Sequence, residues 1–182
     1  MRLKTSSGRS NNDIFAQRID ASGVVQWTAN GVLISTGQSS PTIISDGSGG
    51  AIITWYNVRN DTYAYDIYAQ RIHASGAVQW TADGVAISMA AANQINPTII
   101  SDGSGGAIIT WQEVRNGSDS DIYAQRINVS VVVQWTADGV GISTAENDQL
   151  NPTITSDSSG GAIIMLAQSS NVRFLPSRNV RW

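Results

Sequence analysis

The chain repeats one unit of about 54 residues three times, and this repetition constrains its fold more than any other feature. The segment DIFAQR at residues 13–18 returns as DIYAQR at residues 66–71 and again at residues 121–126. Residues 41–55 and residues 97–111 are identical in every letter. A repeat of this length cannot bury its apolar face alone, so we expect the copies to stack around one continuous core in a single domain.

Apolar residues alternate along the repeat with the period of a β-strand rather than that of a helix. Residues 97–101 and 107–111 predict a hairpin around a glycine-rich turn, which we name the inner hairpin. Residues 66–72 and 77–80 predict a second one, the outer hairpin, and residues 84–88 are part of its outer strand or the exit from it. Four strands in a repeat of this length predict the blade of a β-propeller.

The chain opens on an outer hairpin and closes on an inner hairpin at residues 152–164. We therefore expect an all-β propeller domain over residues 1–182, with three blades' worth of strands and one blade split between the two ends of the chain. The expected repeats and the divergent tail after them have these ranges: 13–65, 66–120, 121–164 and 165–182. Propeller rings close with roughly four to eight blades, so this count predicts a homodimer that completes a six-bladed ring.

The units resemble the blade repeats of bacterial β-propeller proteins and, more distantly, those of kelch, lectin and sialidase-like propellers. The resemblance covers residues 13–164 and rests on the repeated segments quoted above. It implies a secreted or cell-surface location, and no other feature indicates a compartment. Residues 101–111 share letters with the sialidase motif Ser-x-Asp-x-Gly-x-Thr-Trp but not its spacing, so we do not transfer the activity of that family.

Composition argues against several classes of function. The net charge of -3 and the charged fraction of 14% are too small for electrostatic binding to nucleic acid. The chain has no cysteine and no apolar run long enough to span a bilayer. Its single histidine, His73, stands in a variable turn, and the pair Asp119 and Asp121 lacks the further oxygens of a calcium loop. We expect no enzyme activity, no cofactor, no metal site and no nucleic-acid partner.

Two recurring polar positions predict structural roles. An aspartate that can cap backbone amides returns in each inner hairpin turn, at Asp46, Asp102 and Asp157. An arginine that follows a glutamine returns in each outer hairpin, at Arg18, Arg71 and Arg126. Burial between blades would require each guanidinium to find an acceptor, so we expect a repeated network rather than a binding site.

Each copy also places one tryptophan in the outer hairpin, at Trp27, Trp80 and Trp135. An indole in this position either fills the space between blades or offers a flat surface to the apolar face of a sugar. Both roles stay open on the sequence, and we treat the three residues as candidate ligand-binding residues.

The loops that follow the inner hairpins are the most variable part of the repeat. They carry matching polar pairs, Arg59 with Asn60 and Arg115 with Asn116. Variable loops on a repeated scaffold are where binding is usually placed, and these side chains suit hydroxyl groups or a peptide. The alternative is that both loops are solvated and that the arginines hold the backbone in place.

These features predict a non-catalytic binding module, lectin-like, that binds carbohydrate through repeated sites whose modest affinities add by multivalency. The alternative is a structural or protein-interaction propeller, which includes the case of a fragment of a larger secreted protein. Near-identical copies disfavour an enzyme, because catalysis normally needs an asymmetric set of groups.

Overall fold

The structure is a computed structural model that describes residues 12–58, 64–115 and 117–170. Over these residues the chain is all-β, with eleven strands in three sheets and antiparallel pairing throughout. The first sheet holds β1 (Asn12–Ala16), β2 (Val32–Ser45), β3 (Ala51–Asn57), β4 (Asp66–Ile72) and β5 (Val85–Ser88). The second and third hold β6 (Gln94–Ser101), β7 (Ala107–Glu113), β8 (Asp121–Ile127) and β9 (Val140–Ser143), then β10 (Gln149–Ser156) and β11 (Ala162–Gln168).

The long strand β2 belongs to two repeats at once. Residues 32–35 pair with β1, and residues 42–45 pair with β3. The five-stranded sheet is therefore a two-stranded hairpin continuous with a four-stranded sheet, and the chain contains two, four, four and two strands in order. The strands of the inner hairpins and the first strands of the outer hairpins are present where the repeats predict them, and residues of two successive repeats are fused in β2.

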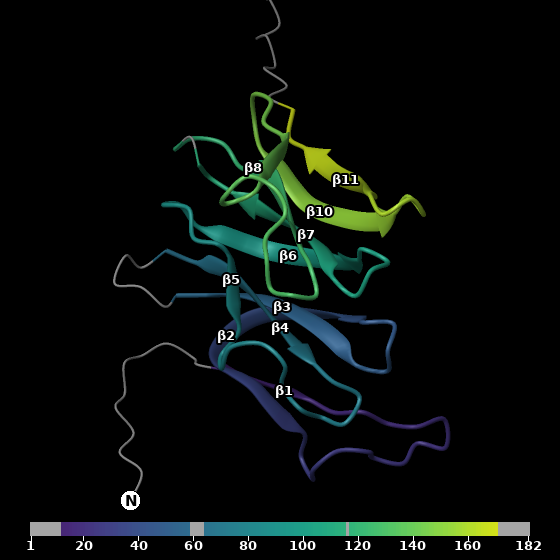
Figure 1. Cartoon of the computed structure of the whole chain (residues 1–182). Helices are drawn as coiled ribbons and strands as arrows, with labels where there is room; N and C mark the ends of the chain where they lie inside the picture. The colour runs from purple at the N-terminus through teal and green to yellow at the C-terminus, as the bar shows by residue number, and fades with distance from the viewer. Residues whose placement is uncertain (1–11, 59–63, 116, 171–182) are drawn as a thin grey trace, which may run out of the picture.

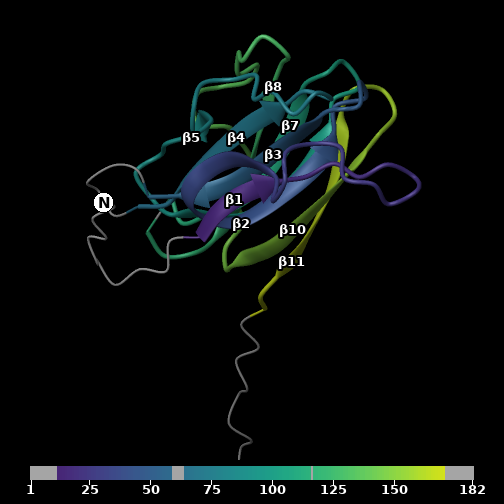
Figure 2. The same cartoon turned by 90° about the horizontal axis from the view of Figure 1, so that it is seen from below.

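The sheets follow one another in chain order along a single stack (Figure 1). β6 packs against β2, β3 and β4, and β10 packs against β6, β7 and β8. β1 lies at one end of the stack and β11 at the other, so the sheets overlap when they are viewed from below (Figures 1 and 2). Within the described residues, β1 pairs only with β2, and β11 pairs only with β10.

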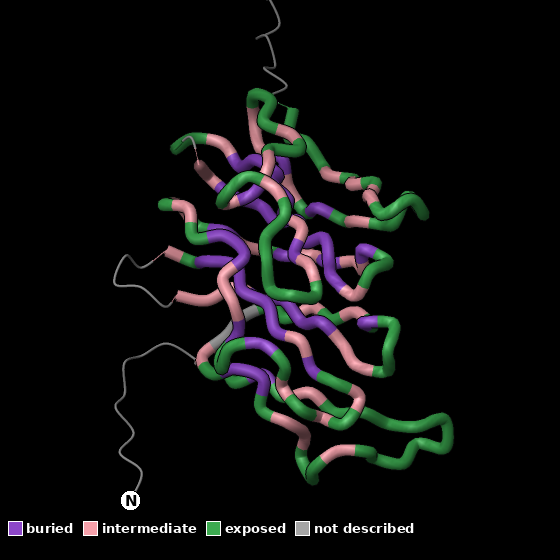
Figure 3. The backbone as a smooth tube through the Cα atoms, in the orientation of Figure 1, coloured by how far each residue is buried: buried purple, intermediate pink, exposed green. Residues whose placement is uncertain are grey.

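The core lies between sheets rather than inside any one of them. One cluster joins the N-terminal hairpin to the first four-stranded sheet and includes Ile14, Ile34, Ile53, Trp55, Tyr68 and Ile72. A larger cluster joins the two four-stranded sheets and includes Ile52, Ile67, Trp80, Ile109, Trp111 and Ile127. Buried backbone is concentrated in the middle of the stack, and exposed backbone lies at its ends and loops (Figure 3). Stacking therefore supplies the burial that a single repeat cannot provide.

In each four-stranded sheet, a tryptophan near the end of the second strand restricts the turn that precedes the fourth strand. Trp55 and Trp111 are fully buried. Gly84 and Gly139 precede the fourth strands with φ of +86° and +88°, and a Cβ on either would lie 2.6 Å from the indole of its own sheet. A side chain cannot fit at that distance, so only glycine allows this turn to pack on the indole.

The outer hairpin differs from the expected one. Residues 77–80 form no strand, because Val78 makes only an isolated bridge, and the fourth strand of the sheet is β5, which lies within the segment 84–88 expected as part of the outer strand or the exit from it. The cause is Gln70 on β4. Its side-chain oxygen accepts from the backbone N–H of Trp80 at 2.9 Å, and its nitrogen donates to the carbonyl of Thr81 at 2.7 Å. The side chain of Gln70 thus satisfies the backbone groups of residues 80 and 81, where strand pairing was expected. The edge of β4 pairs with β5.

The C-terminal strand continues past the last expected repeat. β11 runs to Gln168, which pairs with Gln149 on β10. Leu166 occupies the position of Trp111 in the register, as its place in the repeat predicts. The remainder of the tail, from residue 171, lies outside the described residues.

Candidate binding groove

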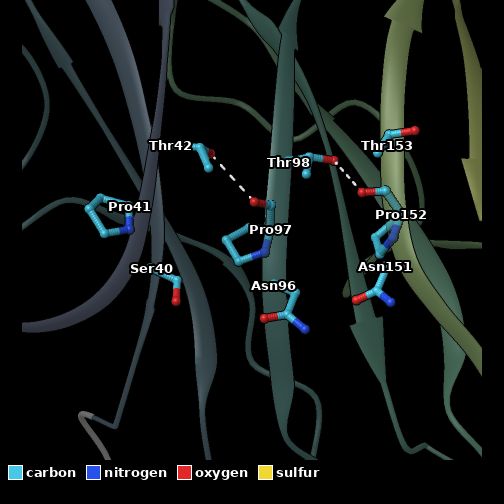
Figure 4. Close-up of a pocket in the computed structure, with 9 residues that line it drawn as sticks. All are labelled: Ser40, Pro41, Thr42, Asn96, Pro97, Thr98, Asn151, Pro152 and Thr153. Carbon is cyan, nitrogen blue, oxygen red and sulfur yellow. Dashed lines mark hydrogen bonds between the residues drawn. The ribbon is translucent and has the colours of Figure 1, made fainter.

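A groove of about 310 Å³ lies across the first strands of three successive sheets. Its lining comes from residues 40–42 on β2, residues 96–98 on β6 and residues 151–153 on β10 (Figure 4). Each of these segments is a Ser or Asn followed by Pro and Thr. The groove is therefore built from one tripeptide used three times.

A bulge in each first strand shapes the groove. Ser40, Asn96 and Asn151 have φ of 49°, 54° and 52°, in the left-handed region. The ladder shifts register at the corresponding place in each inner hairpin. A following proline disfavours the ordinary helical region for the residue before it, and asparagine tolerates positive φ better than most residues. Asparagine, present at two of the three positions, therefore suits the left-handed backbone of this bulge.

Threonine hydroxyls hold the three strands beside one another. The hydroxyl of Thr42 lies 3.5 Å from the carbonyl oxygen of Pro97, and that of Thr98 lies 3.4 Å from the carbonyl oxygen of Pro152. These distances are long for hydrogen bonds, and they repeat from one sheet to the next (Figure 4). The groove therefore has a regular spacing between its tripeptides.

The chemistry of the groove is neutral and polar. Only Ser, Asn, Thr and Pro line it, so it offers amide and hydroxyl groups beside flat proline rings and no titratable side chain. The side chains of Asn96 and Asn151 extend to the same side of the strands (Figure 4). Its polar groups are amides and hydroxyls, which can donate to and accept from the hydroxyl groups of a ligand.

The tryptophans singled out from the sequence lie mainly between sheets. Trp80 is 8% exposed and belongs to the larger core cluster. Trp27 is half-buried, and its indole N–H donates to the carbonyl of Ala74 in the next sheet at 3.0 Å. Trp135 is half-buried in the second four-stranded sheet. The contacts of Trp80 and Trp27 correspond to the space-filling role, and neither residue lines the groove.

The loop residues singled out from the sequence are only partly described. Arg59, Asn60 and Asn116 lie outside the described residues. Arg115 donates through Nε and Nη2 to the carboxylate of Glu113, at 2.8 Å each, and its guanidinium lies 3.8 Å from the centre of the Tyr123 ring. The hydrogen bonds that Arg115 donates to Glu113 raise the pKa of Arg115. This arginine therefore holds the loop in place, and ligand binding by the four loop residues stays a prediction.

Glu113 is a structural residue that the sequence reasoning missed. It is fully buried, and its carboxylate also accepts the indole N–H of Trp111 at 2.9 Å. The first repeat has Asn57 at this position, and there the indole nitrogen of Trp55 has no partner among the described residues. The only available signal was the appearance of a carboxylate where the other copy has an amide.

The aspartates and arginines recur as ion pairs within each four-stranded sheet. Arg71 binds Asp46 at 2.8 Å, and Arg126 binds Asp102 at 3.0 Å. The second oxygen of Asp46 caps the backbone N–H groups of residues 48 and 50, and Asp102 does the same in its turn. Both expectations, a turn aspartate and a structural arginine network, are confirmed, and the structure adds that each residue is the partner of the other.

The described residues contain no candidate metal site. Residues 12–58, 64–115 and 117–170 contain no group of three histidine, cysteine or acidic side chains that could hold a metal ion. His73 is exposed, with Nδ1 2.9 Å from the hydroxyl of Ser75. No described helix is long and apolar enough to cross a membrane.

No family model, curated protein or solved structure matches the chain. The sequence reasoning used the prolines only as markers of the repeat, although the Asn-Pro-Thr pattern around them was the available signal for the groove.

Proposed function

We propose that the chain is a non-catalytic binding module that takes a neutral glycan along the groove between β2, β6 and β10. The observation that carries this proposal is the threefold use of one polar tripeptide on adjacent strands. Asparagine amides can donate to and accept from sugar hydroxyls, and proline rings offer apolar faces to a sugar ring. The absence of charge in the lining favours a neutral ligand over a phosphate or an acidic peptide.

The proposal includes a β-propeller arrangement of the sheets. In a propeller the first strand of each blade faces the central channel, which would place the groove in that channel. Close approach of the first strands, from threonine hydroxyl to proline carbonyl, supports this arrangement. Successive tripeptides would then present equivalent positions to a repeating ligand, and their modest affinities would add.

A glycan array followed by titration of a responding neutral glycan tests the proposal. Asn96→Gly and Asn151→Gly remove the amides while keeping residues that accept the positive φ of these positions. Each change should weaken binding about tenfold, as expected for the loss of one or two hydrogen bonds. Gln134→Ala, an exposed position outside the groove, is the control and should leave the affinity unchanged. An array with no response, or equal affinity for all variants, contradicts the proposal.

A structural or protein-interaction role is the second candidate, and one observation favours it. The strands at both ends of the stack expose large apolar side chains, among them Phe15, Ile19, Ile163 and Met165. Soluble proteins usually cover such strand edges. A chain that assembles with defined stoichiometry and binds no glycan would fit this role and not the first.

A further inference from the structure

Each of the two four-stranded sheets contains an ion pair between its inner and its outer hairpin. Arg71 reaches from β4 to Asp46 in the turn between β2 and β3, and Arg126 reaches from β8 to Asp102 in the turn between β6 and β7. The pair is thus a regular feature of a complete sheet.

The two incomplete sheets contain one half of this pair each. Asp157, in the turn between β10 and β11, caps the backbone N–H groups of Ser159 and Gly161 at 2.8 and 2.9 Å and has no arginine partner among the described residues. Arg18, just after β1, donates to the carbonyl of Ala74 and forms no ion pair within the described residues. Within the described residues, Asp157 therefore lacks the arginine of a complete sheet, and Arg18 lacks the aspartate.

Apolar side chains on β11 and just after β1 are exposed, although their counterparts in complete sheets are buried. Ile163 on β11 is 62% exposed, whereas its counterpart Ile108 on β7 is fully buried. Ile19, after β1, is 65% exposed, whereas its counterpart Ile72 is fully buried. The side chains are the same, so the difference comes from the missing neighbour strand and not from composition.

Contacts between neighbouring sheets are interrupted in the same way. Thr98 approaches the proline carbonyl of the next sheet at 3.4 Å, but Thr153, its counterpart on β10, has no following sheet among the described residues. Trp27 donates to the carbonyl of Ala74 in the next sheet, but Trp135, its counterpart, faces no complete sheet beyond its own. The hydrogen-bonding ladder, the ion pair, the threonine contact and the tryptophan contact all lack a partner at one end of the stack.

We propose that β11 of one chain pairs antiparallel with β1 of a second copy of this chain, and that Asp157 then binds Arg18 of the partner subunit. The register follows from the complete sheets: Trp111 on β7 lies opposite Tyr123 on β8, so Leu166 lies opposite Phe15 of the partner subunit. Each chain has both ends, so two copies complete each other twice with the same contact and close a twofold dimer. This assembly goes beyond the glycan proposal and does not depend on it.

A second copy fits better than closure within one chain. Two four-stranded sheets separate β1 from β11, which lie at opposite ends of the stack (Figure 1). The charges are complementary, since Arg18 at one end and Asp157 at the other form no ion pair within the part of the chain that the structure describes, and both ends expose apolar side chains. In the same arrangement Thr153 would approach Pro41 of the partner subunit, and Trp135 would approach Ala21 of the partner subunit.

A charge exchange between two chains tests the assembly. The native protein should have about twice the 19.4 kDa mass of the chain in light scattering after size exclusion. Arg18→Asp alone, and Asp157→Arg alone, place like charges at both contacts and should raise the dimer dissociation constant at least tenfold, which circular dichroism can separate from unfolding. An equal mixture of the two variants should dimerise again, because every contact then has one arginine and one aspartate. One chain with both changes should also dimerise.

Several outcomes overturn the proposal. A native mass of 19.4 kDa contradicts the dimer. A mass larger than twice that value contradicts the reciprocal dimer. Single variants that dimerise like the native protein, or a mixture that fails to restore the dimer, contradict the pairing of Asp157 with Arg18.

A crosslink gives an independent measurement of the register, because the chain has no cysteine. Thr110 lies opposite Ala124 in the complete sheet, so Met165 should lie opposite Ala16 of the partner subunit. A mixture of Ala16→Cys and Met165→Cys chains should oxidise to a covalent dimer. Ala16→Cys mixed with Ile163→Cys is the matched control, displaced by two residues on the same face, and should crosslink at least tenfold more slowly. Equal rates for the two mixtures overturn the register.

Discussion

At the residue scale, identical side chains have different environments that depend on their place in the stack. Gln70 and Gln125 are fully buried and hold the backbone of the following tryptophan, whereas Gln17 makes the same hydrogen bonds while exposed. Trp80 is buried, while Trp27 and Trp135 are half-buried. The role of a repeated residue is therefore local, but its contribution to stability depends on which sheets cover it.

Trp80→Ala should destabilise the protein by about 3–5 kcal/mol, because it leaves a cavity between the two four-stranded sheets. The unfolding midpoint in urea and the melting temperature both measure this loss. Gln79→Ala, the exposed neighbouring position, should change stability by no more than about 0.5 kcal/mol. An unchanged melting temperature for the Trp80 variant would contradict the space-filling role.

Glu113→Ala should lower the free energy of unfolding by about 2 kcal/mol. The change leaves the buried indole N–H of Trp111 without an acceptor, which accounts for most of the loss. It also removes the ion-pair partner of Arg115, but this contributes less because the guanidinium is partly solvated. Asn57→Ala, at the same register position of the first repeat, is the matched control and should cost less, because no indole N–H depends on it. Equal losses in urea unfolding would refute the role of the carboxylate.

At the element scale, the inner hairpin turn is the best-defined unit of the chain. Its aspartate caps two backbone amides and binds an arginine from the adjacent third strand, so one carboxylate joins three strands of a sheet. The outer hairpin is held differently, by a glutamine side chain and by a glycine packed on an indole. This division explains why the first hairpin was predicted correctly and the fourth strand was not.

The paired aspartates should make stability fall at acid pH. Desolvation raises the pKa of Asp46 and of Asp102, but the turn amides and the paired arginine lower it more, so both lie below the ordinary 3.8. Such a carboxyl contributes stability that is present above its unfolded pKa of about 3.9 and is lost as pH falls through the folded pKa. Desolvation raises the pKa of Asp121, so its contribution has the opposite sign and declines as pH rises.

We therefore expect the urea midpoint to fall below about pH 4 and expect Asp46→Asn with Asp102→Asn to reduce that dependence. Urea unfolding at a series of pH values, from neutral to acid, measures it. If the urea midpoint of the double variant depends on pH as strongly as that of the native protein, other groups cause the acid sensitivity.

At the scale of the whole molecule, stability depends on neighbouring sheets covering one another. Every core cluster joins two sheets, and the two incomplete sheets at the ends of the stack expose the side chains that complete sheets bury. The described repeats thus form an extended array with exposed end strands, and the proposed dimer would cover these strands with the contacts already used inside the chain.

Deletion of residues 151–182 should abolish cooperative unfolding and cause aggregation. It removes most of β10 and all of β11, which cover β6, β7 and β8, and it exposes a new apolar face and strand edge. Truncation after Ser170 is the control, since it retains every described strand and should leave the unfolding transition cooperative. A soluble, cooperatively unfolding deletion variant would contradict the role of this hairpin.

The sequence by itself determined the repeat, the all-β class, the inner hairpins, the capping aspartates and the structural arginines. These features depend on alternation and turn chemistry over a few residues, which neighbouring letters encode. Only the tertiary structure decided that Arg71 meets Asp46, 25 residues away, that the Asn-Pro-Thr segments form one groove, and that Trp80 is buried while Trp135 is half-buried. Such contacts depend on how the sheets stack, which the local sequence of a single repeat does not encode.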